Sequence, residues 1–147
     1  MTRRTWFLVT LAVLLGSVYA YYLTDWINTP RIQIIKSERP VQYRRSSQRI
    51  LPVTFTFDGR YALTAVRVVP VAALATNKHP VPLWHLTTKS NSPPLKGFIY
   101  GQPIRGLKPV SDQTRAQPLE PGVTYRLYVE AGRARGETDF QAHAASE

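Results

Sequence analysis

Three histidines, His79, His85 and His143, are the side chains of this sequence best suited to metal or proton-transfer chemistry. No two of them have the HxH or HxxxH spacing that brings two imidazoles to one metal ion. His85 with Asp58 or Asp139 and a serine would supply the side chains of a hydrolase triad, but no nucleophile-elbow motif accompanies them. We therefore expect histidines of the surface or of strands, and no catalytic residue.

Composition excludes several other kinds of chemistry. The 147 residues contain no cysteine, so a disulfide framework, a thiolate metal site and a cysteine nucleophile are ruled out. No phosphate loop, dinucleotide fingerprint or calcium loop occurs. The sequence predicts a protein that is not an enzyme, with no cofactor, no metal site and no small-molecule substrate.

The charge balance indicates an anionic neighbour. Lysine and arginine number 19 against nine acidic residues, which gives a net charge of +10. The densest basic cluster consists of Arg39, Arg44, Arg45 and Arg49. It is a candidate contact for anionic head groups or for an acidic partner, and the alternative is a solvated loop. We expect no nucleic acid, because a single aromatic residue, Tyr43, interrupts the cluster.

Two further features of the sequence leave alternatives open. Trp84, Phe98 and Tyr100 could form an exposed aromatic platform for a ligand, although such residues more often fill the core of a sandwich. The turn-rich stretch from Lys89 to Pro109 is a second candidate contact surface, since loops on a rigid scaffold often carry binding.

The first thirty residues predict a membrane anchor. No charged residue occurs from Thr5 to Thr24, and the 18 residues from Trp6 to Leu23 would rise about 27 Å as a helix, close to the ~30 Å hydrocarbon core. Arg3 and Arg4 precede this run and favour a cytoplasmic N-terminus, which would export the rest of the chain. Aromatic residues suited to the two membrane interfaces stand near its ends: Trp6, Phe7, Tyr19, Tyr21, Tyr22 and Trp26.

A cleaved signal peptide is the alternative to a retained anchor. In that interpretation Trp6 to Gly16 is the apolar region, and Val18-Tyr19-Ala20 fits the small-residue cleavage pattern. A buried core helix fits poorly, because the run has no polar face. Both leading interpretations place the remaining domain in the periplasm or outside the cell, with the anchored form in the inner or plasma membrane.

The rest of the chain changes to a period of two, which indicates strands. Twelve prolines and eight glycines separate short β-rich runs, and no helix is required after the anchor. Asp58-Gly59 predicts a hairpin turn between two of the runs. About seven strands are expected: Arg31–Ile35, Val53–Phe57, Tyr61–Val69, Pro82–Thr88, Lys96–Gly101, Tyr125–Ala131 and Glu137–Ala142.

One motif connects these strands to a known family. Leu119-x-Pro121-Gly122-x-x-Tyr125 resembles the tyrosine corner of fibronectin type III domains and related immunoglobulin-like sandwiches. The resemblance implies that the Leu packs under the corner, the Pro-Gly pair turns the chain between sheets, and the Tyr hydroxyl bonds to backbone just upstream. The tryptophan of the family's second strand has no counterpart here, so we expect Phe55 or Phe57 to fill its space.

The predicted fold is therefore all-β: an immunoglobulin-like or fibronectin type III-like sandwich of seven strands behind one N-terminal transmembrane helix. The expected parts are a cytoplasmic N-terminus at 1–4, a transmembrane helix or uncleaved signal anchor at 5–27, a basic juxtamembrane segment with the first strand at 28–49, the remainder of the exported sandwich at 50–142, and a tail at 143–147, the sandwich as a whole spanning about 31–142.

These features predict a non-enzymatic, single-pass membrane protein that serves as an accessory or structural subunit of a larger membrane complex. A respiratory, photosynthetic or secretion assembly could host it. Its expected partners are membrane lipid and other membrane-protein subunits. The alternative is an independent exported module that binds an anionic polymer, a lipid surface or an acidic protein through its basic face.

Overall fold

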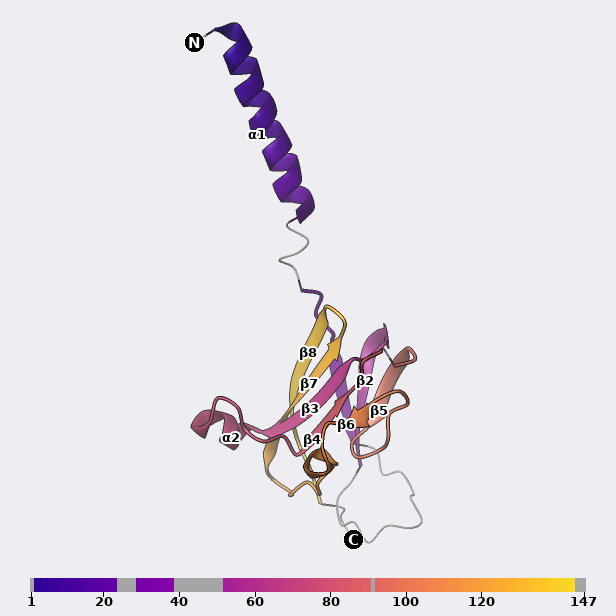
Figure 1. Ribbon diagram of the computed structural model, residues 1–147. Coiled ribbons are helices and arrows are strands. Elements are labelled where there is room, and N and C mark those ends of the chain that lie inside the picture. The colour runs from indigo at the N-terminus through magenta and orange to yellow at the C-terminus, as the bar shows by residue number, and fades with distance from the viewer. Residues whose placement is uncertain (1, 24–28, 39–51, 91, 145–147) are drawn as a thin grey trace. The chain divides into compact units, whose positions relative to one another are not determined.

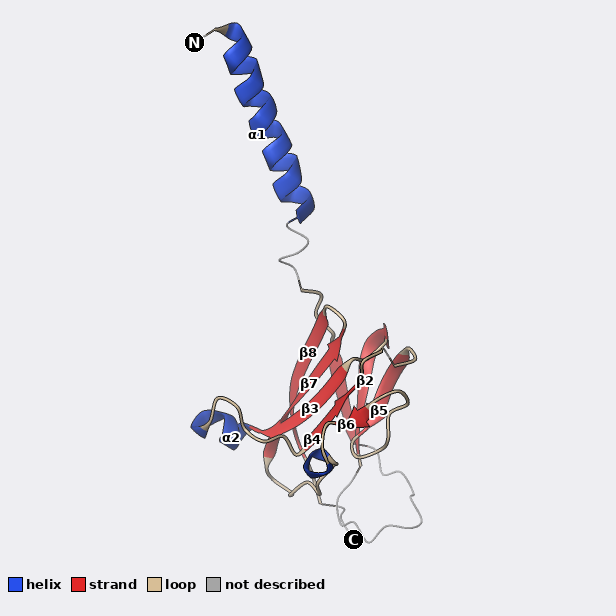
Figure 2. Ribbon diagram, viewed as in Figure 1, coloured by secondary structure: helices blue, strands red, loops and turns tan. Residues whose placement is uncertain are grey.

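The computed structural model describes residues 2–23, 29–38, 52–90 and 92–144. The chain divides into two compact units, Met1–Pro30 and Arg31–Glu147. The described part of the first unit is mainly one helix, and the second is mostly β-structure in two antiparallel sheets (Figure 2). An apolar N-terminal helix and a sandwich-like domain are thus both confirmed.

Helix α1 runs from Arg3 to Leu23, and none of its side chains is buried. Its 21 residues correspond to a length of about 31 Å. The only charged residues in it are Arg3 and Arg4, in the first turn. The helix is therefore long and apolar enough to cross a membrane.

The second unit has a three-stranded and a five-stranded sheet (Figure 1). The three-stranded sheet has the order β1-β2-β5, and the five-stranded sheet has the order β6-β4-β3-β7-β8. The strands are β1 (Ile34–Glu38), β2 (Val53–Tyr61), β3 (Ala65–Pro70), β4 (Trp84–Thr87), β5 (Leu95–Ile99), β6 (Lys108–Pro109), β7 (Thr124–Ala131) and β8 (Ala134–Gln141).

The alternating sequence of β2 and β7 produces the two inner faces of the sandwich. Val53, Phe55 and Phe57 are buried along β2, while Thr54 and Thr56 are partly exposed. On β7 the buried residues are Tyr125, Leu127 and Val129. Successive side chains of a strand point to opposite faces, so the period of two in the sequence places the apolar half of each strand against the core.

Aromatic rings connect the two sheets. The ring of Phe55 on β2 lies 5.4 Å from that of Phe98 on β5 and 5.0 Å from that of Phe140 on β8. Trp84 on β4 is 2% exposed and lies 5.8 Å from Phe98. Tyr100 is partly buried beside Trp84. Trp84, Phe98 and Tyr100 therefore belong to the core and do not form an exposed platform.

A tight hairpin joins β7 to β8. Ala131 pairs with Ala134, so Gly132 and Arg133 alone form the turn. Gly132 has a φ of 62°, a conformation that glycine adopts without steric cost. The last strand, expected from Glu137, therefore begins three residues earlier, at Ala134.

The hairpin turn predicted at Asp58-Gly59 is wrong. Strand β2 continues through both residues to Tyr61, and Gly59 is not among the glycines with a positive φ. Strands β2 and β3 lie in different sheets, and the chain crosses between them around the fully buried Leu63. The Asp58 carboxylate accepts a hydrogen bond from the Tyr61 hydroxyl at 2.9 Å, so Asp58 bonds to a residue of its own strand and does not cap a turn.

The expectations of seven strands and of no second helix also differ from the structure. Helix α2 (Val71–Thr76) follows Pro70, because three alanines and a leucine favour a helix once the proline has ended the strand. The stretch from Gly101 to Pro118, expected as loop, contains β6 and a 3-10 turn at Asp112–Thr114. The described residues thus form eight strands, of which β6 has two residues.

A substitution at Gly97 on β5 tests how closely the strands of the three-stranded sheet approach each other. A Cβ atom at this position would lie 2.3 Å from the Phe55 carbonyl oxygen, whereas one at Gly59 would meet only side-chain atoms of Tyr61, at 3.6 Å or more. We expect Gly97→Ala to lower the free energy of unfolding by about 1–3 kcal/mol. Denaturant titration of the detergent-solubilised chain measures this, with Gly59→Ala as control. Equal losses of stability for Gly97→Ala and Gly59→Ala would contradict the close approach of the strands at Gly97.

Candidate functional site

The residues predicted at the membrane interfaces are exposed where the structure describes them. Trp6 and Phe7 near the start of α1 are 66% and 70% exposed, and Tyr19, Tyr21 and Tyr22 near its end are 68%, 80% and 75% exposed. Trp26 lies outside the described residues. Aromatic side chains therefore stand at both ends of the helix with no protein cover in their own unit.

Two hydroxyl side chains in the middle of α1 bond to carbonyl groups of the helix itself. The Thr10 hydroxyl donates to the Trp6 carbonyl at 2.9 Å, and the Ser17 hydroxyl donates to the Val13 carbonyl at 2.8 Å. An unpaired hydroxyl is costly in hydrocarbon, so these bonds make the helix surface compatible with lipid.

The tyrosine-corner residues lie together at the start of β7. Leu119 and Tyr125 are 6% and 2% exposed, and the Glu120 backbone N–H donates to the Tyr125 hydroxyl oxygen at 2.9 Å. Gly122 has a φ of 80°, and its N–H donates to the Ala142 carbonyl at 3.1 Å. Pro121 forms a parallel bridge with the same Ala142. These contacts hold the chain as it enters β7, which is a structural role.

The predicted basic cluster cannot be placed. Arg39, Arg44, Arg45 and Arg49 all lie outside the described residues, so their contact with lipid or protein stays a prediction. The second candidate surface, from Lys89 to Pro109, is described except at residue 91. Part of it belongs to the sandwich, because it includes β5 and the buried Ile104 and Leu107.

The three histidines lie in separate places. His85 is on β4, opposite Arg67 of β3. His79 is in the loop after α2, and the His143 ring nitrogen Nδ1 lies 2.7 Å from a carboxylate oxygen of Glu38. Within the ranges that the structure describes, no three histidine or acidic side chains lie close enough to hold a metal ion.

The environment of His85 favours the neutral imidazole. Partial burial lowers the pKa of His85 from its ordinary value, the nearby Arg67 guanidinium lowers it further, and Glu130 acts in the opposite direction. The two aspartates considered with His85 have other partners, since Asp58 accepts from Tyr61 and Asp139 pairs with Arg126. The structure does not bring the three together as a triad.

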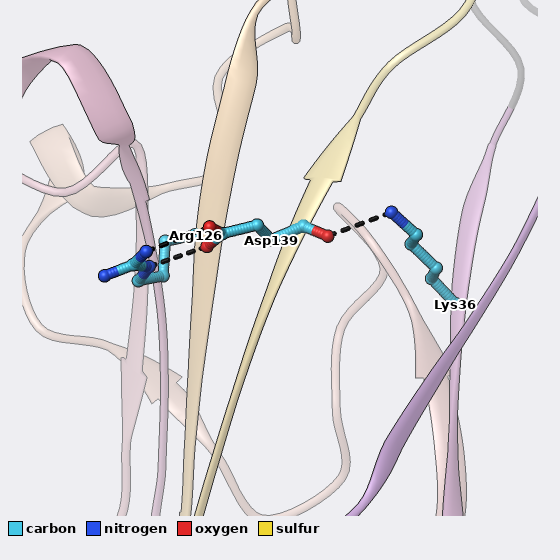
Figure 3. Close-up of polar contacts among 3 residues, drawn as sticks. All are labelled: Lys36, Arg126 and Asp139. Atoms are coloured by element: carbon cyan, nitrogen blue, oxygen red, sulfur yellow. Dashed lines mark hydrogen bonds and ion pairs between the residues drawn. The ribbon is translucent and has the colours of Figure 1, made fainter.

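The outer face of the five-stranded sheet carries a set of paired charges that the sequence interpretation missed. Arg126 on β7 donates two hydrogen bonds to Asp139 on β8, at 2.6 and 2.9 Å (Figure 3). This guanidinium lowers the pKa of the Asp139 carboxyl, and the carboxylate raises the pKa of Arg126. A two-point contact of this kind fixes geometry better than a single ion pair does.

Asp139 also connects the two sheets. The Lys36 ammonium on β1 donates to the Asp139 backbone carbonyl at 3.0 Å, from the side opposite to Arg126 (Figure 3). Nearby, the Ile32 N–H donates to the Arg135 carbonyl at 2.9 Å, and a Cβ at Gly136 would lie 2.7 Å from the Ile32 carbonyl oxygen. The first strand of one sheet thus closes against the last strand of the other.

Strand register determines the other side-chain pairs on the outer face of the five-stranded sheet. The Arg67 guanidinium lies 4.8 Å from the centre of the Tyr128 ring, and Arg135 lies 4.0 Å from the Glu130 carboxylate. Alternation along β7 places Arg126, Tyr128 and Glu130 on one face, but only pairing with β3 and β8 supplies the partners.

No family model matches the chain, and neither a curated protein nor a solved structure is found to be similar to it.

The Arg126–Asp139 pair predicts a pH-dependent contribution to stability. The folded state lowers the pKa of Asp139, so the stabilisation is present above the ordinary carboxyl pKa of about 4 and is lost as pH falls through the lowered value. We expect Asp139→Asn to cost about 0.5–1 kcal/mol at pH 7, because the carboxylate is 44% exposed, and progressively less as pH falls below the ordinary carboxyl pKa.

Unfolding by urea at pH 7, 4 and 2 measures this difference. Asp112→Asn is the matched control, because the Asp112–Arg115 pair is almost fully exposed and should contribute nothing measurable. A loss for Asp139→Asn that stays constant down to pH 2 would show that the carboxylate charge is not its cause.

The Tyr125 hydroxyl should contribute through its bond to the Glu120 N–H. Tyr125→Phe leaves that backbone donor without its partner and should reduce the free energy of unfolding by about 1–2 kcal/mol. Tyr61→Phe, which removes a bond to the exposed Asp58, should have a clearly smaller effect in the same denaturant titration. The role assigned to the corner would be disproved by an equal or larger effect of Tyr61→Phe.

Proposed function

We propose that the chain is a non-enzymatic, single-pass membrane protein with an exported immunoglobulin-like domain, and that it serves as an accessory or structural subunit of a larger membrane complex. The observation that carries this proposal is α1, whose large apolar side chains are all exposed, from 38% at Leu23 to 80% at Tyr21. Apolar surface of this extent needs lipid or another protein to cover it.

The orientation in the membrane follows from the ends of the helix. Arg3 and Arg4 are the basic residues before the apolar run, and they favour a cytoplasmic N-terminus. The sandwich then lies in the periplasm or outside the cell. A sequence without cysteine is compatible with an oxidising compartment, since no free thiol is present to react there.

The order of the strands supports an immunoglobulin-like domain. The first, second and fifth strands share one sheet, while the third strand lies beside β7, and β7 beside β8, in the other. Strands A, B and E and strands C, F and G of an immunoglobulin domain are divided between its two sheets in the same way. Strand β4 pairs with β3 instead of joining the smaller sheet. Domains of this architecture mostly bind or space other proteins, which suits a subunit without chemistry of its own.

Capture of the tagged chain from native membranes in mild detergent tests the function, with mass spectrometry of the bait and its partners. We expect stoichiometric membrane proteins and a bait that retains its first twenty residues. A complex held by α1 should persist at high salt and dissociate in harsh detergent. A bait that begins at Tyr21 and runs alone would refute the anchor and favour a separate exported binding module.

A matched pair of helix variants sharpens this experiment. Ala12, Gly16 and Ala20 recur at every fourth residue and share one face of α1, and a Cβ at Gly16 meets nothing within 4 Å in its own unit. Gly16→Leu should weaken recovery of a partner that packs on this face by about tenfold, whereas Val18→Leu on the opposite face should not. Equal recovery with both variants would show that the partner is held elsewhere.

A further inference from the structure

One end of the sandwich brings together residues from distant parts of the chain. The chain enters the domain at Arg31, which forms a parallel bridge with Arg135 just after the β7–β8 turn (Figure 1). The loop that follows β4 reaches the same end, because Thr88 donates to the Thr64 carbonyl and Thr64 donates to the Glu130 carbonyl near the end of β7. The end of β2 also lies here, where Tyr61 pairs with Leu95.

This end is strongly basic. Exposed lysine and arginine side chains come to it from five separate segments, and we call them the basic end: Arg31, Arg60, Lys89, Lys96, Arg133 and Arg135. Acidic residues also occur at or beside this end, among them Asp58, Glu130 and Glu137. Asp58 bonds to the Tyr61 hydroxyl, and Glu130 approaches Arg135 only to 4.0 Å. In the described ranges, no ion pair engages Arg31, Arg60, Lys89, Lys96 or Arg133.

The basic end is tied closely to the apolar helix by chain length. Seven residues separate Leu23, the last residue of α1, from Arg31. Fully extended, this connection spans at most about 28 Å, whatever the arrangement of the two units. The short connection therefore keeps the basic end within reach of a bilayer that α1 crosses.

We propose that the basic end binds the anionic head groups of the membrane that α1 crosses. The inference rests on the proposed function, because it requires α1 to span a bilayer. Each lysine or arginine held near an anionic surface contributes about 1 kcal/mol, and the attraction falls off within about 10 Å at 0.1 M salt. Several such charges are enough to hold the domain in one orientation on the lipid, without a specific pocket.

A head-group surface fits these charges better than an acidic protein does. The six residues come from five segments, in loops and near strand ends, so their charges are spread over one end of the domain. A spread of this kind matches the many separate charges of a lipid surface. The basic end is also assembled only by folding, since its members are spread from residue 31 to residue 135. It is distinct from the cluster at Arg39 to Arg49 that the sequence indicates.

Fluorescence quenching in vesicles tests the proposal with the full chain. The absence of cysteine allows one label at Ser90→Cys, in the loop of the basic end, and a control label at Ala75→Cys on α2, beside the opposite end of β3. Vesicles of phosphatidylcholine, with or without about one third phosphatidylglycerol, carry a nitroxide on some head groups. We expect phosphatidylglycerol to increase quenching at Ser90 at least twofold, salt near 1 M to abolish the increase, and Ala75 to show none.

Matched charge variants identify the residues responsible. Lys89→Gln with Arg133→Gln should reduce the phosphatidylglycerol-dependent quenching by half or more. Lys78→Gln with Arg115→Gln removes the same charge elsewhere on the domain and should leave the quenching unchanged. Inorganic phosphate at constant ionic strength should not compete, and if it did, a discrete anion site would replace the proposed surface.

The possible failures are distinguishable. Flotation in a density gradient shows whether the chain is bound to the vesicles at all. A chain that floats with neither kind of vesicle would refute the membrane span and this inference together. A chain that floats with both, but shows equal quenching at Ser90 in both, would overturn only the lipid assignment. If the Lys89→Gln, Arg133→Gln variant then loses its partners in the membrane capture experiment, the basic end is a protein contact instead.

Discussion

The burial of Phe55 between the two sheets is the contact on which the domain depends. Its ring meets Phe98 of its own sheet and Phe140 of the other, and it is fully buried. Because both sheets are covered on only one face, this layer of aromatic and aliphatic side chains is the main reason that they pack. Gly97 allows the neighbouring strand to approach, so that Phe98 can reach Phe55.

Hydrogen bonds at the edge of the sandwich add to the apolar packing of the core. Lys36 and Ile32 bond to backbone carbonyls of the last strand. The Tyr125 hydroxyl accepts a hydrogen bond from the Glu120 backbone N–H, just before β7. Such bonds add little free energy individually, yet they select one register and one closure of the sandwich.

The two units serve different physical requirements. Helix α1 pairs the hydroxyl groups of Thr10 and Ser17 with its own carbonyls and presents exposed apolar side chains along its length, which suits a solvent without hydrogen-bonding capacity. Among the described residues, the sandwich carries paired charges on the five-stranded sheet, and several lysines and arginines of the basic end are in no ion pair. The proposed contact with head groups would use those cations. In the proposed role as an accessory membrane subunit, the helix would hold the chain in place and the basic end would orient the domain.

The sequence by itself determined the apolar helix, the two-sheet β class and the buried faces of β2 and β7, because those depend on local periodicity. Only the tertiary structure decided that Asp58-Gly59 lies within a strand and that Arg126 meets Asp139. It also decided that the six residues of the basic end, which are spread along the chain, lie at one end of the sandwich. Those features depend on register and on which strands become neighbours. Register is set by burial across the whole domain, which no short stretch of residues contains.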